Sequence, residues 1–142
     1  MLHETVSDIR VRYAETDQMG VVYHANYLIW CEIGRTDFIR SIGQPYASLE
    51  ADGLRLAVSE AALRFHASAR YDDSLFVHTR LVDVRSRSLT FAYQIVHNDR
   101  GLVVGATTSL VSLAADGRAV ALPGALRGLM QGALTQPFLR AR

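Results

Sequence analysis

Hydrophobic and polar residues alternate near the start of the chain, in the stretch VSDIRVRY. Ile9, Val11 and Tyr13 occupy one set of alternate positions, and charged residues occupy the other. Successive side chains of a strand point to opposite faces, so this period of two is typical of a strand with one buried face. The pattern predicts a first strand over residues 6–13.

From about His24 to Ile42 the large apolar residues recur at steps of three and four. They are Tyr27, Leu28, Cys31, Phe38 and Ile42. This spacing places them on one face of a helix of about five turns. Glu32 and Arg35, three positions apart, predict an ion pair on that helix. Gly43 can adopt the left-handed conformation that ends helices, so the helix is expected to stop near Ile42.

Four later stretches are rich in β-branched and aromatic residues. They are RLAVSEAALRFHA, SLFVHTRLVDVR, SLTFAYQIVHN and LVVGATTSLVSLAA. NDRG at 98–101 is the clearest hairpin turn, and breaks at 71–74 and 85–88 indicate further reversals, so the last three strands should form a meander. We therefore expect an α+β fold, with a five-stranded antiparallel sheet curled around one long helix. The stretch after Leu122 predicts a terminal turn of helix.

The composition restricts the class of protein. A chain of 142 residues that is 49% hydrophobic suits one domain over 1–142, with a core over about 5–115 and a tail over 116–142. The net charge of +1 favours neither nucleic acid nor an anionic membrane as a partner. No apolar run approaches the ~20 residues that span a bilayer. The single cysteine, Cys31, excludes an internal disulfide and cysteine-rich metal sites, and favours a cytoplasmic location.

A lone acid, Asp17, lies seven residues before His24, where the predicted helix starts. The first amides of a helix have no intrahelical acceptor and carry partial positive charge, so they can polarise a carbonyl group. If the loop folds back, the Asp17 carboxylate can act beside them as a nucleophile or as a base that activates water. A thioester suits this small set of groups, because a thiol with a pKa near ~8.5 leaves as thiolate with little need of an acid.

Simpler structural roles stay open for the same residues. Asp17 can close a local turn or cap the following helix. The His24 side chain can be a neutral residue at the helix start, or it can contact substrate or water. Tyr13 and Tyr23 suit packing, although Tyr23 is also a candidate catalytic residue.

The stretch VRYAETDQMGVVYHANYLIWCEIGRTDFIRSIG closely resembles the opening of the hotdog-fold thioesterases of the 4-hydroxybenzoyl-CoA and YbgC type. ARYDD at 69–73 is similar to the family's segment between its second and third strands. The resemblance implies a hotdog fold and acyl-CoA thioesterase activity, with Asp17 as the catalytic carboxylate and the His24 N–H as the donor to the thioester carbonyl. It also implies a homo-oligomer built from dimers with one continuous sheet, for which we predict a dimer of dimers, a homotetramer, rather than a single dimer, and no cofactor beyond the coenzyme A of the substrate.

The phosphates of coenzyme A also need partners. The candidates are Arg85, Ser86, Arg87 and Ser88 in VRSRSL, where the resemblance places nucleotide contacts, and Arg70 in ARYDD. A solvated basic turn is the alternative interpretation of VRSRSL. The carrier of the acyl group, coenzyme A or acyl carrier protein, stays open.

Motifs of other chemistries are missing from the sequence. It contains no G-x-S-x-G, no Walker-type loop and no H-E-x-x-H, and its five histidines have spacings that indicate no metal cluster. An alternative with the same fold is a protein that binds an acyl thioester without hydrolysing it, or an enoyl-CoA hydratase-like enzyme. Asp17 favours hydrolysis, because a binding protein needs no carboxylate beside a carbonyl-polarising site.

Overall fold

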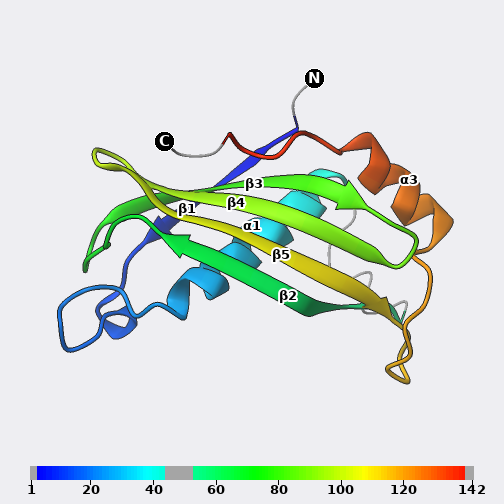
Figure 1. The fold of residues 1–142 in the computed structure, drawn as a ribbon, viewed down its shortest axis with the longest axis horizontal. Helices are drawn as coiled ribbons and strands as arrows, with labels where there is room; N and C mark the ends of the chain where they lie inside the picture. The colour runs from blue at the N-terminus through cyan, green and yellow to red at the C-terminus, as the bar shows by residue number, and fades with distance from the viewer. Residues whose placement is uncertain (1–2, 44–52, 140–142) are drawn as a thin grey trace.

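The computed structural model of the chain describes residues 3–43 and 53–139, which include one sheet of five strands (Figure 1). The strands are β1 (Thr5–Arg10), β2 (Arg55–Phe65), β3 (Ser74–Val84), β4 (Ser88–His97) and β5 (Gly101–Leu113). They lie in the order β1-β3-β4-β5-β2, and every neighbouring pair is antiparallel. The predicted antiparallel sheet and the meander of its last three strands are therefore confirmed.

The first strand is shorter than its alternating pattern predicts. It pairs with β3 from Thr5 opposite Thr79 to Arg10 opposite Ser74, and it ends there. The Val11 N–H then donates to the carbonyl of Asp73 (3.0 Å), and the chain turns into a short 3₁₀ helix at Tyr13–Glu15. The alternation continues past the strand end because Val11 still packs into the core, where it is almost fully buried.

Helix α1 (Asn26–Ser41) is the long helix that the periodicity predicts. It packs against one face of β1, β3 and β4, with Trp30, Cys31, Phe38 and Ile39 buried beneath it. Gly34 gives the closest approach, because a Cβ atom built there would lie 2.9 Å from Cγ1 of Val77 and closer still to the hydroxyl of Thr79. The helix ends near Ile42 as expected, with Gly43 at a φ of 87°.

The expectation of one long helix was incomplete, because a second helix, α3 (Gly124–Gly132), forms where the sequence predicted only a terminal turn. Leu126 and Met130, four positions apart, are both buried on its inner side. The segment after it continues along β3 beyond the end of β1, and the Thr135 N–H donates to the carbonyl of Leu81 (2.9 Å). Three glycines weaken the helical signal of this stretch, so its contact with β3 decides the structure.

Strand β2 forms one edge of the sheet and β1 forms the other. β2 pairs with β5 along its length, with a bulge between Val58 and Glu60. Its other edge has no partner strand among the described residues, and both Val58 and Phe65 are about half exposed. Within the two described ranges, no helix is both long enough and apolar enough to cross a membrane.

Candidate active site

The loop between β1 and α1 is organised by Glu15, a residue that the sequence did not single out. Its buried carboxylate accepts hydrogen bonds from the backbone N–H of Arg12 (2.7 Å) and from the indole N–H of Trp30 (3.1 Å). Its carbonyl oxygen accepts from the backbone N–H of Tyr23 (2.9 Å) and from the side chain of Asn26 (2.8 Å). Glu15 therefore joins the start of the loop to the start of helix α1.

Burial opposes the ionisation of Glu15, but the hydrogen bonds that it receives outweigh this effect. Donation from the backbone and side chain of Arg12 and from Trp30 lowers the pKa of Glu15 below its ordinary value. The side chain is therefore a carboxylate at neutral pH. Because its oxygens are engaged and buried, it serves to position the loop rather than to react with a substrate.

Asp17 lies in the same loop, between Thr16 and Val22, which pair in an isolated antiparallel bridge and close the loop. Its Oδ1 accepts from the N–H of Met19 (2.8 Å) and, more distantly, from the N–H of Val21 (3.5 Å). Both bonds go to one oxygen, and Oδ2 has no hydrogen-bond donor among the described residues. The carboxylate thus closes a local turn, the simpler role considered above, and still presents a second oxygen that is available for chemistry.

Helix α1 starts without a side-chain cap, because its N-cap residue is Ala25. The N–H groups of His24 and Ala25 donate no hydrogen bond within the described part of the chain. The next two amides donate to the preceding turn, from Asn26 to Tyr23 and from Tyr27 to His24. Two adjacent free donors therefore stand at the positive end of the helix, an arrangement that can stabilise an oxyanion.

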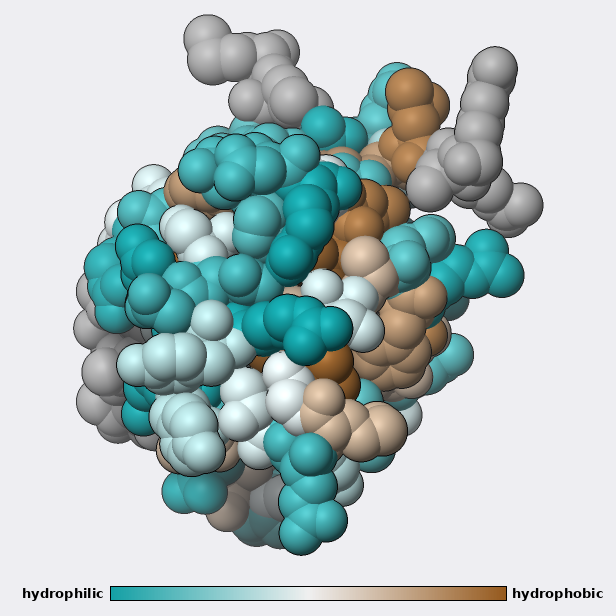
Figure 2. Space-filling view, turned by 90° about the vertical axis from the view of Figure 1, so that its left-hand side faces the viewer, coloured by the Kyte–Doolittle hydropathy of each residue, from teal (hydrophilic) through white to brown (hydrophobic). Residues whose placement is uncertain are grey.

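An open cleft of about 740 Å³ joins the loop to the helix start. Asp17, Tyr23 and Asn26 line it, together with Tyr13, Ala14, Thr16 and Gln18. Figure 2 faces this end of the molecule and shows polar side chains over one side, with hydrophobic side chains gathered beside them. The fold therefore brings Asp17 and Tyr23 to one cleft, whereas the third candidate, His24, is not among the residues that line it.

Aromatic rings surround the His24 side chain. Its ring lies 4.5 Å from the ring of Tyr23 and 6.5 Å from that of Phe65, measured between centroids. Phe65 also contacts the ring of Tyr27, at 5.8 Å. These contacts place the end of β2 beside the start of α1, and they give both Tyr23 and His24 a packing role.

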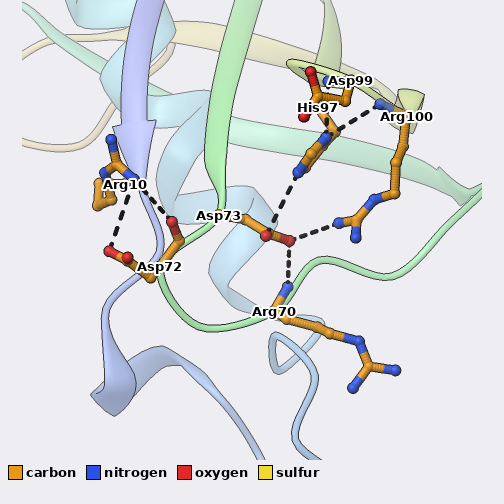
Figure 3. Close-up of polar contacts among 7 residues, drawn as sticks. All are labelled: Arg10, Arg70, Asp72, Asp73, His97, Asp99 and Arg100. Carbon is orange, nitrogen blue, oxygen red and sulfur yellow. Dashed lines mark hydrogen bonds and ion pairs between the residues drawn. The ribbon is translucent and has the colours of Figure 1, made fainter.

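The segment that contains Arg70 is held at the same end of the sheet by Asp73 (Figure 3). The Asp73 carboxylate accepts from the N–H of Arg70 (2.8 Å) and from the guanidinium of Arg100 (2.6 Å), and it lies 3.5 Å from Nε2 of His97. Burial opposes its ionisation, but these donors lower the pKa of Asp73. Neighbouring Ala69 accepts a hydrogen bond from the N–H of Val22 (2.8 Å), which ties this segment to the start of helix α1.

The orientation of the His97 ring follows from its backbone contacts. Its Nδ1 accepts from the N–H groups of Asp99 (3.0 Å) and Arg100 (3.1 Å), so the ring proton is on Nε2 and faces Asp73. The guanidinium of Arg70, by contrast, points away from this cluster in Figure 3 and is exposed. It can therefore reach a ligand at this end of the molecule.

The turn at 85–88, which contains the other proposed coenzyme A contacts, lies at the opposite end of β3 from the Asp17 loop (Figure 1). Strand β3 separates the two ends by about 35 Å, at roughly 3.3 Å per residue. In the turn, Arg85 donates to the carboxylate of Asp83 (2.9 Å), and the Arg85 N–H donates to the carbonyl of Ser88 (2.8 Å). Within one chain, Arg85, Ser86, Arg87 and Ser88 therefore do not meet Asp17.

The prediction of an ion pair between Glu32 and Arg35 was wrong. Arg35 instead donates to the hydroxyl of Tyr93 on β4 (3.1 Å). Sequence spacing could not find this contact, since the two residues are 58 positions apart. Cys31, one turn before Arg35, is fully buried, and burial raises the pKa of its thiol to about 12, so it is not a nucleophile at neutral pH.

A five-stranded antiparallel sheet, a long helix across one face and an acid-bearing loop before that helix define the hotdog class of proteins. A sequence model described as the thioesterase-like superfamily matches residues 11–134, so the chain belongs to this family. The resemblance seen in the sequence is therefore confirmed.

Two named relatives and one solved structure are similar over most of the chain. The putative acyl-CoA thioesterase YneP of Bacillus subtilis is 38% identical over 108 residues, which cover 76% of this chain and 78% of YneP. The acyl-CoA thioester hydrolase YbgC of Escherichia coli is 35% identical over 95 residues, which cover 67% of this chain and 71% of YbgC. The hypothetical protein TT1821 of Thermus thermophilus superimposes with a TM-score of 0.86 at 37% identity, over 90% of this chain and 98% of that chain.

Proposed function

We propose that this protein hydrolyses acyl-CoA thioesters to the free acid and coenzyme A, at the cleft between the Asp17 loop and the start of helix α1. The observation that supports this proposal most directly is a cleft lined by Asp17, whose carboxylate has a free oxygen, and by Tyr23 and Asn26, the residues on either side of the two free amides. The names of the relatives YneP and YbgC agree with it.

The catalytic steps follow from these groups. The N–H groups of His24 and Ala25 bind the thioester oxygen and stabilise the negative charge that develops on it. Oδ2 of Asp17 either attacks the carbonyl carbon, giving a mixed anhydride that water then hydrolyses, or removes a proton from the attacking water. The C–S bond breaks, the sulfur leaves as thiolate, and the acyl carbon gains the oxygen of water.

The loop bonds to Oδ1 contribute to this mechanism. They hold the carboxylate in one orientation without engaging Oδ2, so the reactive oxygen loses little freedom in the transition state.

The proposal includes a homo-oligomer, at least a dimer, formed through the free edge of β2. Antiparallel pairing of two β2 edges would make a continuous sheet and cover Val58 and Phe65. Because the two β2 strands would run in opposite directions, the sheet end that contains the 85–88 turn in one subunit would lie on the same side as the sheet end that contains the Asp17 loop in the other. The 85–88 turn of the partner would then approach the Asp17 cleft, where its arginines and serines could join Arg70 at the phosphates of coenzyme A.

The test is thiol release from a panel of short, long and aromatic acyl-CoAs, with wild type, Asp17→Asn and Asp8→Asn. Asp8 is an exposed acid on β1 outside the cleft, so its variant controls for the loss of one charge. We expect Asp17→Asn to lower kcat by about a hundredfold or more, about 3 kcal/mol, while Asp8→Asn keeps the wild-type rate.

Two outcomes would contradict the proposal. Wild-type kcat in the Asp17→Asn variant would remove Asp17 from the mechanism. If no thioester releases its thiol, the protein is better described as a binder of acyl thioesters or as a hydratase of enoyl-CoA, and loss of enoyl absorbance on incubation with enoyl-CoA would separate these two.

A further inference from the structure

The two free amides at the start of helix α1 are held from two directions. Glu15 accepts hydrogen bonds from the residue just before them and from the residue just after them. Ala69 also contacts both sides. Its carbonyl accepts from the N–H of Val22 (2.8 Å), and its backbone hydrogen-bonds with the hydroxyl of Tyr27 in the first turn of the helix. The position of the free amides therefore depends on Ala69 as well as on Glu15.

Ala69 begins the segment 69–73, which is held to the end of β1. Ala69 itself is fully buried. The N–H of Asp72 donates to the carbonyl of Val11 (2.9 Å), and the N–H of Val11 donates to the carbonyl of Asp73 (3.0 Å). Asp72 has a φ of 68°, and in the described part of the chain no other residue except glycine has a positive φ. Such a backbone conformation persists only where the surrounding contacts hold it, so these contacts fix the segment.

The Asp73 carboxylate joins this segment to the β4–β5 hairpin (Figure 3). One oxygen accepts from the N–H of Arg70 in the segment (2.8 Å) and from the guanidinium of Arg100 in the hairpin (2.6 Å). The other oxygen lies 3.5 Å from Nε2 of His97. The side chains of Asp73 and His97 are only 18% and 10% exposed, and that of Arg100 is 47% exposed. An ion pair that is partly shielded from water in this way is stronger than a fully exposed one.

A chain of contacts thus runs from the hairpin to the free amides. Arg100 contacts the Asp73 carboxylate, and this carboxylate binds the backbone of Arg70. The next residue back along the chain is Ala69, which holds the residues on both sides of the amides. Neither Asp73 nor Arg100 lines the Asp17 cleft. Any effect of this pair on catalysis within one subunit therefore passes through the position of the amides.

We propose that Arg100 and Asp73 are positioning residues for the two amides that bind the thioester oxygen. This inference rests on the proposed function for the role of those amides. Negative charge develops on the thioester oxygen only as the transition state forms, so misplaced donors lower kcat and leave substrate binding almost unchanged. A small displacement has a large effect, because a hydrogen bond weakens steeply when its angle and distance depart from the optimum.

The first test measures kcat and KM on the best acyl-CoA substrate for wild type, Arg100→Met, Arg100→Lys and Arg40→Met. Arg40 donates to the carboxylate of Asp37 (3.0 Å) near the far end of helix α1, so its variant removes a similar ion pair away from the amides. We expect Arg100→Met to lower kcat by about tenfold and to change KM by less than about twofold. Arg100→Lys keeps the charge and should recover most of the lost kcat. Arg40→Met should keep both wild-type constants.

Amide hydrogen exchange gives a second readout that does not depend on activity. The N–H of Val22 exchanges only when the helix start separates from the segment 69–73. The N–H of Leu122 donates to the carbonyl of Ser86 (2.8 Å), and Leu122 is as deeply buried as Val22, so it reports on the rest of the fold. We expect Arg100→Met to speed exchange at Val22 by about tenfold and to leave Leu122 unchanged. Equal acceleration at both amides would mean a general loss of stability and would contradict the inference.

The kinetics can overturn the inference in three ways. A higher KM with unchanged kcat in Arg100→Met would assign Arg100 to the binding of the coenzyme A phosphates instead. An Arg100→Lys variant as slow as Arg100→Met would show that the charge has no such role. Asp73→Asn supplies the third check, because two residues that act through one contact give losses that do not multiply. The double variant Asp73→Asn, Arg100→Met should be no slower than the slower single variant, and a multiplied loss would contradict the inference.

The two readouts together separate this inference from the proposed function. If no thioester is hydrolysed but exchange at Val22 responds to Arg100→Met, the hydrolytic function fails and the link between the hairpin and the amides stands. If hydrolysis proceeds and Arg100→Met changes neither kcat nor the exchange at Val22, the reverse holds.

Discussion

Two carboxylates in one short loop have different roles because their surroundings differ. Glu15 is buried and accepts hydrogen bonds through both oxygens, whereas Asp17 is partly exposed and has one oxygen free. The resemblance in the sequence drew attention to Asp17. The role of Glu15 depends on Trp30, fifteen residues away, so no local pattern revealed it.

We expect Glu15→Gln to destabilise the fold in a pH-dependent way. The folded-state pKa of Glu15 is lowered, so its stabilisation is fully present above the unfolded value near 4.5 and is lost as the pH falls through the folded value. The variant should therefore lose about 1–3 kcal/mol of unfolding free energy at neutral pH, and its stability should fall less steeply in acid than that of wild type. Urea unfolding at a series of pH values measures both effects.

Asp8→Asn is the control for this experiment, because Asp8 is exposed on β1, away from the proposed interface. It should reproduce the wild-type curve. Part of the acid sensitivity should persist in Glu15→Gln, since the pKa values of Glu4 and Asp73 are also lowered on folding. Parallel curves for Glu15→Gln and wild type, differing only by a constant, would contradict the role assigned to the Glu15 charge.

Among the elements, the contact between α1 and β3 sets the distance of the helix from the sheet. At Gly34 the helix backbone approaches Val77 and Thr79 so closely that no side chain fits. The apolar periodicity predicted that this helix would be buried on one face. It could not predict the close approach. In the sequence, a glycine within a helix shows only as a weak helix former, and the side chains that it meets lie on another element.

Gly34→Ala should therefore destabilise the protein by about 1–3 kcal/mol, since the added methyl group overlaps side chains of a packed core. Gly128→Ala is the matched control on α3, where a Cβ atom would meet nothing within 4 Å. That change should stabilise the protein by about 0.5–1 kcal/mol, because alanine is the better helix former. Thermal or urea unfolding gives both values, and changes of the same sign would contradict the close-approach interpretation.

At the scale of the whole molecule, the two edges of the sheet are not equivalent. Beyond the end of β1, the exposed edge of β3 is followed by the segment after α3. The edge of β2 has no such neighbour in the described residues, and β2 meets the start of α1 through Phe65. An assembly through β2 would therefore place the subunit interface next to the candidate active site.

We expect Val58→Asp to dissociate the oligomer and to lower thioesterase activity together. Val58 is about half exposed on β2, and a charge buried in a subunit interface without a partner is strongly unfavourable. Val6→Asp is the control, because Val6 is equally exposed but lies on β1 at the other edge. Sedimentation velocity gives the mass of each variant, and circular dichroism confirms that it is folded. A monomeric wild type, or dissociation by Val6→Asp alone, would contradict assembly through β2.

The amino-acid sequence by itself determined the strands, the long helix and the family, because hydrophobic periodicity is local and the opening motif is short and specific. It also indicated Asp17 and the start of the helix as the place of the chemistry. The tertiary structure alone decided which oxygen of Asp17 is free, that Glu15 holds the loop, that Arg35 contacts Tyr93 instead of Glu32, and that α3 forms a full helix. Each of these depends on groups that are distant in sequence or on the packing of a surface, and no local pattern contains that information.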